Sequence, residues 1–272
     1  MGSLRVRRSL LLSVFAVMIL SSGLVIRAQS TASQDPAKVF EAIKGSYYHP
    51  DALPGLDCDV TIDWPAFLQQ LKAPAEGAKA FEGLKMRSHA LRDQTATVDF
   101  NWNGSAPAGS DQIQGGMRQM IGGFYQMYWP MIAKAPLQKA SEISRLEPQT
   151  DGTLKVFTGK EGSSVILDLN KDMTPAHYTL DLTSLKGEMT MHYEDSPHPE
   201  PGDLHRLVGM DVVEKIGESH MNVNVKLDYQ SLAEYFVPQK VSFDIVGAFS
   251  VNLEFSACTV ISGPKPDDAA KP

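Results

Sequence analysis

The sequence contains little cysteine and lacks the short motifs that mark common enzyme classes. Only two of its 272 residues are cysteine. It has no Gly-x-Ser-x-Gly nucleophile elbow, no His-Glu-x-x-His zinc motif and no Gly-rich phosphate loop. The usual hydrolase, zinc-protease and nucleotide-binding assignments therefore have no signature. We expect a protein that is not an enzyme and uses no cofactor. An exported hydrolase is the alternative if a Ser or Asp lies beside a His in a pocket.

The N-terminal apolar run is too short to cross a bilayer comfortably. It covers Ser9–Leu20, follows the basic stretch Arg5–Arg8 and ends at Ser21–Gly23. This order of basic, apolar and small residues is typical of an export signal. We expect residues 1–28 to be a signal peptide cleaved near Ala28, with an uncleaved membrane anchor as the alternative. The mature protein should be exported and soluble, periplasmic in a Gram-negative host and otherwise secreted.

Positive charge is scarce in the mature chain. Residues 1–28 hold four of the 25 basic residues and none of the 32 acidic ones, which leaves a formal charge of −11. Such a surface repels nucleic acid, so we exclude nucleic acid as a partner. The remaining length is enough for one large domain, which we place at residues 29–262. The Pro-, Asp- and Ala-containing end at 263–272 indicates a disordered tail.

Three segments have helical patterns. A short amphipathic helix should begin at Asp35-Pro36, and a second at Asp63–Pro65 should run to residue 71, with 75–84 as its continuation. The long helix is expected over 111–133. It carries two glycine pairs, Gly115-Gly116 and Gly122-Gly123, and each glycine costs about 1 kcal/mol relative to alanine. Either this helix is interrupted, or its backbone needs close approach and mobility at these glycines.

Alternating polar and apolar residues predict about ten strands. They are 56–64, 96–102, 154–158, 164–169, 175–182, 187–193, 204–214, 220–229, 238–246 and 251–261. Their short connections favour an antiparallel up-and-down order. The last two strands form a hairpin with one apolar face, in which we pair Ile245 with Val251, Phe243 with Leu253 and Val241 with Phe255. An apolar face of this size must cover something.

The two cysteines suggest a disulfide, because an exported protein with an even cysteine count usually pairs them. Joining Cys58 to Cys258 would stabilise the fold by roughly 5 kcal/mol on the chain-entropy model. Alternation places Cys58 on the apolar face and Cys258 on the polar face. A bond therefore needs a bulge near Ala257, and two separate thiols are the alternative.

Two polar features have a metal-binding interpretation and a simpler one. A four-residue turn at 183–186 would set His177 opposite His192, with Asp181 or Glu188 nearby. A solvated strand face accounts for these residues equally well, so we predict no metal site. The loop 194–205 is acidic and contains His, but its prolines mark it first as a long connection and only second as an ion or partner site.

The long helix is rich in methionine, which adapts to apolar ligands of varied shape. Four of its methionines and its aromatic residues could line a cavity that accepts lipid. Ordinary core packing of the helix on the sheet is the alternative. The residues in question are Met117, Met120, Met127, Met131, Phe124, Tyr125, Tyr128 and Trp129.

The C-terminal hairpin carries a family resemblance. Val237–Val241 (Val-Pro-Gln-Lys-Val) and Val251–Ser256 (Val-Asn-Leu-Glu-Phe-Ser), together with the order of elements, resemble the periplasmic outer-membrane lipoprotein-sorting (LolA-like) superfamily. The resemblance implies an α+β, mainly β fold: a curved antiparallel up-and-down sheet, or half-barrel, with helices packed across the concave face. It also implies that acyl chains are held in the apolar concavity.

The resulting hypothesis is an exported carrier for lipid, an acyl chain or a lipidated protein, with peripheral contact to membrane machinery. A non-catalytic structural or interaction domain with a packed core is the alternative. The expected ligand-binding residues come from the long helix and the C-terminal hairpin: Met117, Met120, Ile121, Phe124, Tyr128, Met131, Val241, Phe243, Leu253 and Phe255.

Overall fold

The computed structural model describes residues 35–70, 81, 83–107, 109–160, 163–181, 186–194, 204–216 and 219–262. The predicted signal peptide, most of the predicted continuation over 75–84, most of the 194–205 loop and the predicted tail lie outside the described residues. Those expectations stay predictions. Leu84 itself begins a strand.

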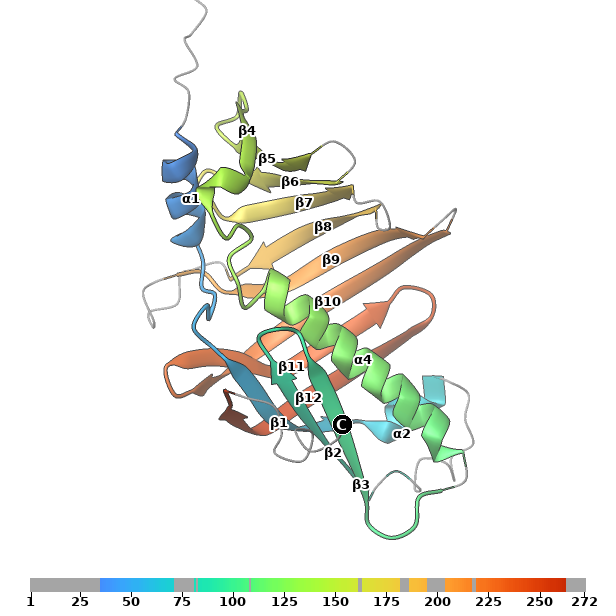
Figure 1. Ribbon diagram of the computed structural model, residues 1–272. Coiled ribbons are helices and arrows are strands. Elements are labelled where there is room, and N and C mark those ends of the chain that lie inside the picture. Colours follow the sequence, from blue (N-terminus) through green and yellow to red (C-terminus); the bar gives the residue numbers. More distant parts are fainter. Residues whose placement is uncertain are drawn as a thin grey trace, which may run out of the picture. The chain divides into compact units, whose positions relative to one another are not determined.

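The described residues form one antiparallel sheet of twelve strands (Figure 1). In sequence order the strands are β1 (Gly55–Ile62), β2 (Leu84–Leu91), β3 (Ala96–Trp102), β4 (Ile143–Pro148), β5 (Leu154–Lys160), β6 (Ser163–Leu169), β7 (Pro175–Asp181), β8 (Lys186–Tyr193), β9 (Leu207–Ile216), β10 (Ser219–Leu232), β11 (Tyr235–Ile245) and β12 (Phe249–Val260). Their spatial order is β3-β2-β1-β12-β11-β10-β9-β8-β7-β6-β5-β4. Every neighbour is consecutive in sequence except the pair β1 and β12. The predicted mainly β, up-and-down antiparallel class is confirmed.

Two strands were missed by the sequence patterns, so the predicted number of ten was too low. In β2 the residues that face the core are Met86, Ser88 and Ala90, and the serine and alanine weaken the apolar alternation. In β4, an edge strand, only Ile143 is buried, while Arg145 and Glu147 pair with each other at 2.7 Å. Neither strand therefore carries the repeated large apolar residues on which the prediction depends.

The helices begin close to where the sequence places them. They are α1 (Pro36–Lys44), α2 (Trp64–Gln70), α4 (Ser110–Met131) and the short 3-10 turn η1 (Ala140–Glu142). The Asp35 side chain accepts a hydrogen bond from the Ala37 amide at 3.0 Å and caps α1. The predicted interruption at the glycine pairs and the predicted close approach of their backbone are both wrong. The helix α4 runs through them without a break, and a Cβ atom on any of the four would meet no atom within 4 Å.

The β11–β12 hairpin keeps its predicted faces but not its predicted partners. Val241 pairs with Leu253, Phe243 with Val251 and Ile245 with Phe249. The register differs from the prediction by two residues because the turn contains only Val246, Gly247 and Ala248. A shift of two leaves every side chain on the same face, so the apolar wall survives. We call this apolar side of the sheet the inner face and the opposite side the outer face.

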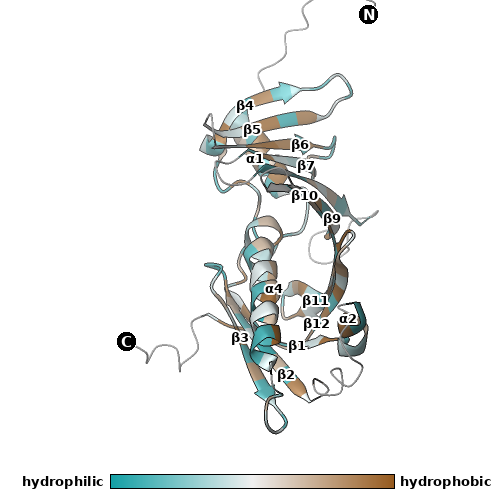
Figure 2. Cartoon of the chain, turned by 90° about the vertical axis from the view of Figure 1, so that its right-hand side faces the viewer, coloured by the Kyte–Doolittle hydropathy of each residue, from teal (hydrophilic) through white to brown (hydrophobic). Residues whose placement is uncertain are grey.

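The helix α4 covers part of the inner face. In both views it lies along β1–β3, β11 and β12, whereas α1 lies at one end of the strands around β7 (Figures 1 and 2). The ring of Phe124 lies 5.4 Å from that of Phe255 and 6.1 Å from that of Phe243. The long helix is therefore the cover that the C-terminal hairpin requires.

Candidate functional site

The structure brings the ten predicted ligand-binding residues into one apolar cluster between α4 and the β11–β12 hairpin, but it divides them by exposure. Seven are buried, each with at most 4% of its surface exposed: Met117, Ile121, Phe124, Tyr128, Val241, Leu253 and Phe255. The other three, Met120, Met131 and Phe243, are only partly buried. The buried seven act as packed core, and the partly exposed three mark where the apolar surface opens.

One flank of α4 is fixed against β2 and β3. The Tyr125 hydroxyl hydrogen bonds with that of Ser88 in β2 at 3.0 Å, and the Arg118 guanidinium lies 4.7 Å from the centre of the Phe100 ring in β3. Burial raises the pKa of Tyr125, so this hydroxyl stays neutral. This contact sets the rotation of the helix about its axis.

The opposite flank of α4 carries the partly exposed methionines. At 3.6 residues per turn, Met120 and Met127 point about 140° and about 160° away from Tyr125. Because Tyr125 contacts Ser88 of β2 and Phe124 packs on Phe243 of β11, this methionine flank lies on the β11 side of the helix. Met120, Met127 and Met131 are all half-buried, although they pack against the core on one side. We call Met120, Met127 and Met131 the methionine flank.

Glycines border the methionine flank on its solvent side. Gly116 and Gly123 lie within about 60° of Met120 and Met127 around the helix axis. A Cβ atom at either glycine would meet nothing within 4 Å. The helix is thus narrow along this border, and space remains beside the methionines.

The inner face of the sheet continues the apolar surface beyond the helix. Met189, Val212, Val223 and Ile245 are successive neighbours across β8, β9, β10 and β11. Met189 is buried, whereas Val212, Val223 and Ile245 are half-buried. We call this set the inner row. On the sheet, sequence reasoning limited the site to the C-terminal hairpin and missed the part of this row on β8, β9 and β10, although the same alternation that predicted these strands contained the signal.

A pocket of about 480 Å³ lies where the chain after α4 crosses β5 and β6. Its apolar wall includes Leu137 and Leu167, which are buried, and the partly buried Val165. Val165 pairs with Leu180 of β7, which is also half-buried. The pocket is lined by Pro136, Leu137, Ser141, Glu142, Ser144, Thr158, Gly159, Val165 and Leu167. Apolar surface is therefore accessible at this edge of the sheet as well.

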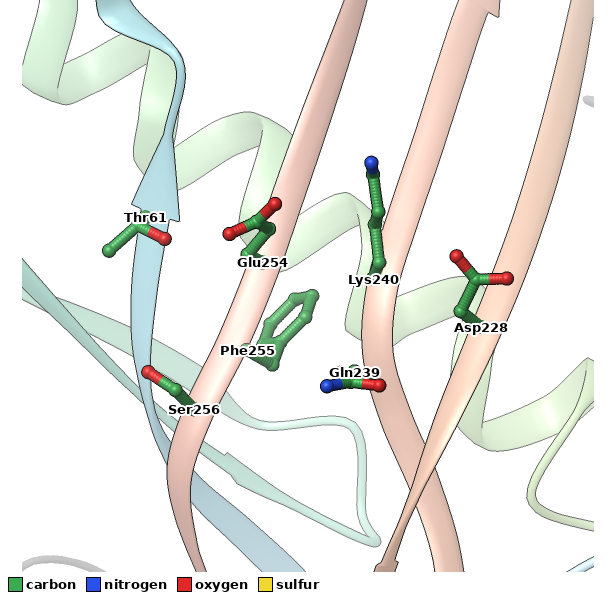
Figure 3. Close-up of a pocket in the computed structure, with 7 residues that line it drawn as sticks. All are labelled: Thr61, Asp228, Gln239, Lys240, Glu254, Phe255 and Ser256. Carbon is green, nitrogen blue, oxygen red and sulfur yellow. The ribbon is translucent and has the colours of Figure 1, made fainter.

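A second pocket, of about 350 Å³, lies on the outer face and is polar (Figure 3). Asp228, Lys240, Glu254 and Thr61 form one cross-strand row over β10, β11, β12 and β1. Gln239, Ser256 and Phe255 complete the lining. Charged neighbours of alternating sign across a sheet are an ordinary stabilising pattern of a solvated face.

Cys58 and Cys258 form a disulfide between β1 and β12, with Cα atoms 4.1 Å apart. The pairing of the two strands shifts between Asp57 and Asp59, so that Cys58 opposes both Ala257 and Cys258. Ala257 has φ of +46°, a left-handed conformation. The extra residue reverses the alternation beyond it and turns Cys258 toward Cys58.

The predicted opposition of His177 and His192 is wrong. Leu180, not Leu182, pairs with Gly187, so His177 lies opposite Thr190, and the two side chains are in contact at 3.2 Å. The His192 ring bonds instead to Asp211 at 2.8 Å. Within the described parts of the chain, no group of three potential ligands is placed to hold a metal ion.

Three His side chains lie beside an Asp, the arrangement that the hydrolase alternative needs in a pocket: His49 beside Asp51, His89 beside Asp57 and His192 beside Asp211. The Nδ1 atom of His89 is 3.4 Å from a carboxylate oxygen of Asp57 on the outer face. Arg87 binds the carboxylates of both Asp57 and Asp59, and these bonds, that to Asp59 foremost, raise the pKa of Arg87. Asp57 is therefore engaged by two basic groups that link β1 to β2.

Comparison with known proteins gives a distant likeness. The sequence matches no protein-family model and no curated protein. The fold is similar to a crystal structure from Vibrio parahaemolyticus described as an outer membrane lipoprotein-sorting protein domain, with a TM-score of 0.26 and 9% sequence identity over 88% of this chain and 96% of that one. Among the helices described for this chain, none has the length and apolarity to cross a membrane.

Proposed function

We propose that this protein is an exported carrier that holds a lipid, an acyl chain or a lipidated protein on its inner face. The ligand would lie between the methionine flank of α4 and the inner row of the sheet. The observation that carries the proposal is the partial exposure of both surfaces, since each leaves large apolar side chains in reach of solvent. Apolar surface that remains accessible in a native fold is typical of a binding site.

The energetics favour an acyl chain as the occupant. Each buried methylene contributes about 0.8 kcal/mol, so a chain of about ten carbons can supply binding free energy without any polar contact. Methionine side chains adapt to ligands of different shape at little cost. The bordering glycines leave space where the chain would pass beside the helix. These features support a binding surface that accepts apolar ligands of different shapes.

A pair of matched double variants tests the proposal. Met120→Glu with Met127→Glu places two carboxylates on the methionine flank, where they would face the ligand. Gln119→Glu with Gln126→Glu adds the same charge to the same helix on its exposed side. Native mass spectrometry after incubation with dodecanoyl lipid should show adducts on the wild type and on the glutamine variant. The methionine variant should lose them while its circular dichroism stays unchanged.

A second candidate is supported by the complete burial of seven predicted binding residues. In an interaction domain with a filled interior, these residues would be core and the accessible methionines would be incidental. Under that alternative no variant and no wild-type sample takes up lipid, and the methionine substitutions alter only the free energy of unfolding. Absence of adducts on the wild type would therefore reject the carrier.

A further inference from the structure

The strand β4 lies at one end of the described sheet, where only β5 pairs with it (Figure 1). The Gln149 amide donates to the Thr153 carbonyl at 2.9 Å, so these two residues form a hydrogen-bonded pair just beyond the strand. Hydrogen-bonded and non-hydrogen-bonded pairs alternate along an antiparallel ladder. The backbone groups of Arg145 and Glu147 therefore face β5, and those of Leu146 face outward. An outward N–H and C=O at the end of a sheet are a template for a further strand.

The side chains of β4 carry opposite charges on one face and an apolar residue on the other. Leu146 is half-buried against the core on the inner face. Its two neighbours, Arg145 and Glu147, consequently lie on the outer face, where they pair with each other at 2.7 Å. Their side chains are 58% and 41% exposed, so each is free to turn toward a charge across the edge. The strand thus presents one cation and one anion, placed symmetrically about Leu146.

This arrangement is complementary to a second copy of the same strand. In an antiparallel pair of two β4 strands centred on Leu146, each Leu146 would donate one backbone hydrogen bond to its counterpart and accept one from it. Arg145 of each copy would lie opposite Glu147 of the other. Centring the pair on Arg145 or on Glu147 would instead place like charges opposite each other, which destabilises a sheet. Of these three registers, only the one centred on Leu146 pairs opposite charges.

The strand at the other end of the sheet, β3, lacks this complementarity. Val98 is buried on its inner face, so the outer face carries Thr97, Asp99 and Asn101. Two copies of β3 paired in the same way would place Asp99 opposite itself, Thr97 or Asn101. None of these residues supplies a positive charge. Charge therefore favours β4 over β3 as the edge that meets a second copy.

We propose that two copies of this protein associate edge to edge through β4, in a two-fold antiparallel pair centred on Leu146 and specified by Arg145 and Glu147. The inference does not depend on the proposed carrier function. The pairing places the two inner faces on the same side and brings the two Leu146 side chains together. It uses the β4 edge of both copies, so assembly through this edge stops at a dimer.

The contact is short, and the association is therefore weak and reversible. The strand β4 spans six residues, and Pro148 at its end has no N–H to donate to another strand. Interfaces of such limited size belong to the transient class. We expect a dissociation constant on the order of 100 µM, so sedimentation equilibrium of the mature protein should be measured below and above that concentration.

An exchange of charges tests the register. Arg145→Glu and Glu147→Arg should each weaken the association at least about tenfold, because each places like charges at both cross-edge positions. An equimolar mixture of the two variants should recover the wild-type dissociation constant, since one variant then supplies two carboxylates and the other two guanidinium groups. Circular dichroism of each variant before mixing should match that of the wild type, because both side chains are exposed.

Asp181→Lys and Lys186→Asp are the matched controls. These exposed residues form an ion pair at 3.0 Å between β7 and β8, which are not end strands, so neither substitution should change the association. Amide exchange gives a second measurement within β4. The exchange of the Leu146 amide should slow as the protein concentration rises, whereas the Glu147 amide, which already bonds to β5, should respond less.

Three results would overturn the proposal. The first is a wild type that remains monomeric at every concentration, which would leave the β4 edge unpaired or available only to a different protein. The second is association that survives in both single variants, and the third is a mixture that stays as weak as its components. Either of the last two would mean that another surface, or another register, joins the copies.

Discussion

At the scale of single residues, the glycines of α4 are destabilising choices that no packing contact requires. Gly123 faces open space, so Gly123→Ala should raise the free energy of unfolding by about 1 kcal/mol, measured by urea denaturation. Gly187→Ala is the contrast, because its Cβ would lie 2.9 Å from the Val213 carbonyl oxygen in the next strand. That variant should be destabilised. A lower stability for Gly123→Ala would contradict the continuous helix described here.

The same residues show what sequence can and cannot predict at this scale. The Asp35 cap followed from local chemistry alone, since the side chain and the amide it binds are two positions apart. The surroundings of Gly123 could not be predicted from local chemistry, because they depend on which side of α4 meets the sheet. That rotation is set by Tyr125 and Ser88, which are 37 positions apart. For the same reason the pattern located the methionines of α4 but could not separate Met117, which is buried, from Met120, which is half-exposed.

At the scale of elements, α2 supplies hydrogen bonds to the first residues of β12. The Gln70 side chain accepts a hydrogen bond from the Ser250 amide at 2.6 Å and donates one to the Ser250 carbonyl at 2.9 Å. On this side of β12, β1 pairs only with Leu253 and the residues after it, so Gln70 takes the place of the missing strand at Ser250. Gln70→Ala should lower the free energy of unfolding by about 1–2 kcal/mol and speed hydrogen exchange at Ser250. Gln69→Ala, on the same helix, should do neither. Equal effects of the two variants would mean that the amide contact contributes nothing.

The strands also show why pairing register is harder to predict than the face of the sheet on which a side chain lies. Alternation assigned Val241, Phe243 and Leu253 to the inner face correctly, yet their partners were wrong by two residues. A shift of two preserves every face, so the hydrophobic pattern cannot detect it, and only the length of the turn decides. The two missed strands, β2 and β4, fail for a different reason, because they place few large apolar residues on the inner face.

At the scale of the whole molecule, one strand pair joins the three N-terminal strands to the rest of the sheet. β1 and β12 are the only adjacent strands in the described sheet that are not consecutive in sequence, and the Cys58–Cys258 disulfide joins them. Replacing both cysteines by serine should lower the free energy of unfolding by roughly 5 kcal/mol on the chain-entropy model, measured in urea. The wild type in a thiol reductant should lose a similar amount, and the variant should not respond to the reductant. A reductant effect on the variant would refute this account.

At this scale too, the sequence was informative in part. Short loops between alternating strands predicted the meander from β5 to β12, because each of those pairings is local. The meeting of β1 with β12 has no local signal apart from the two cysteines. Alternation placed the two cysteines on opposite faces of the sheet, so a disulfide between them required a bulge near Ala257. Ala257 has a left-handed backbone, and the bulge there turns Cys258 to the same face as Cys58.

The position of β1 also fixes the order in which the fold can be completed. Its partner β12 is the last strand of the described chain, and Cys258 follows Cys58 by 200 residues, so β1 to β3 cannot join the main sheet until β12 has been synthesised. Pairings of such long sequence separation are slow to form. A nascent chain with this topology therefore keeps β1 to β3 apart from the main sheet until β12 has been made.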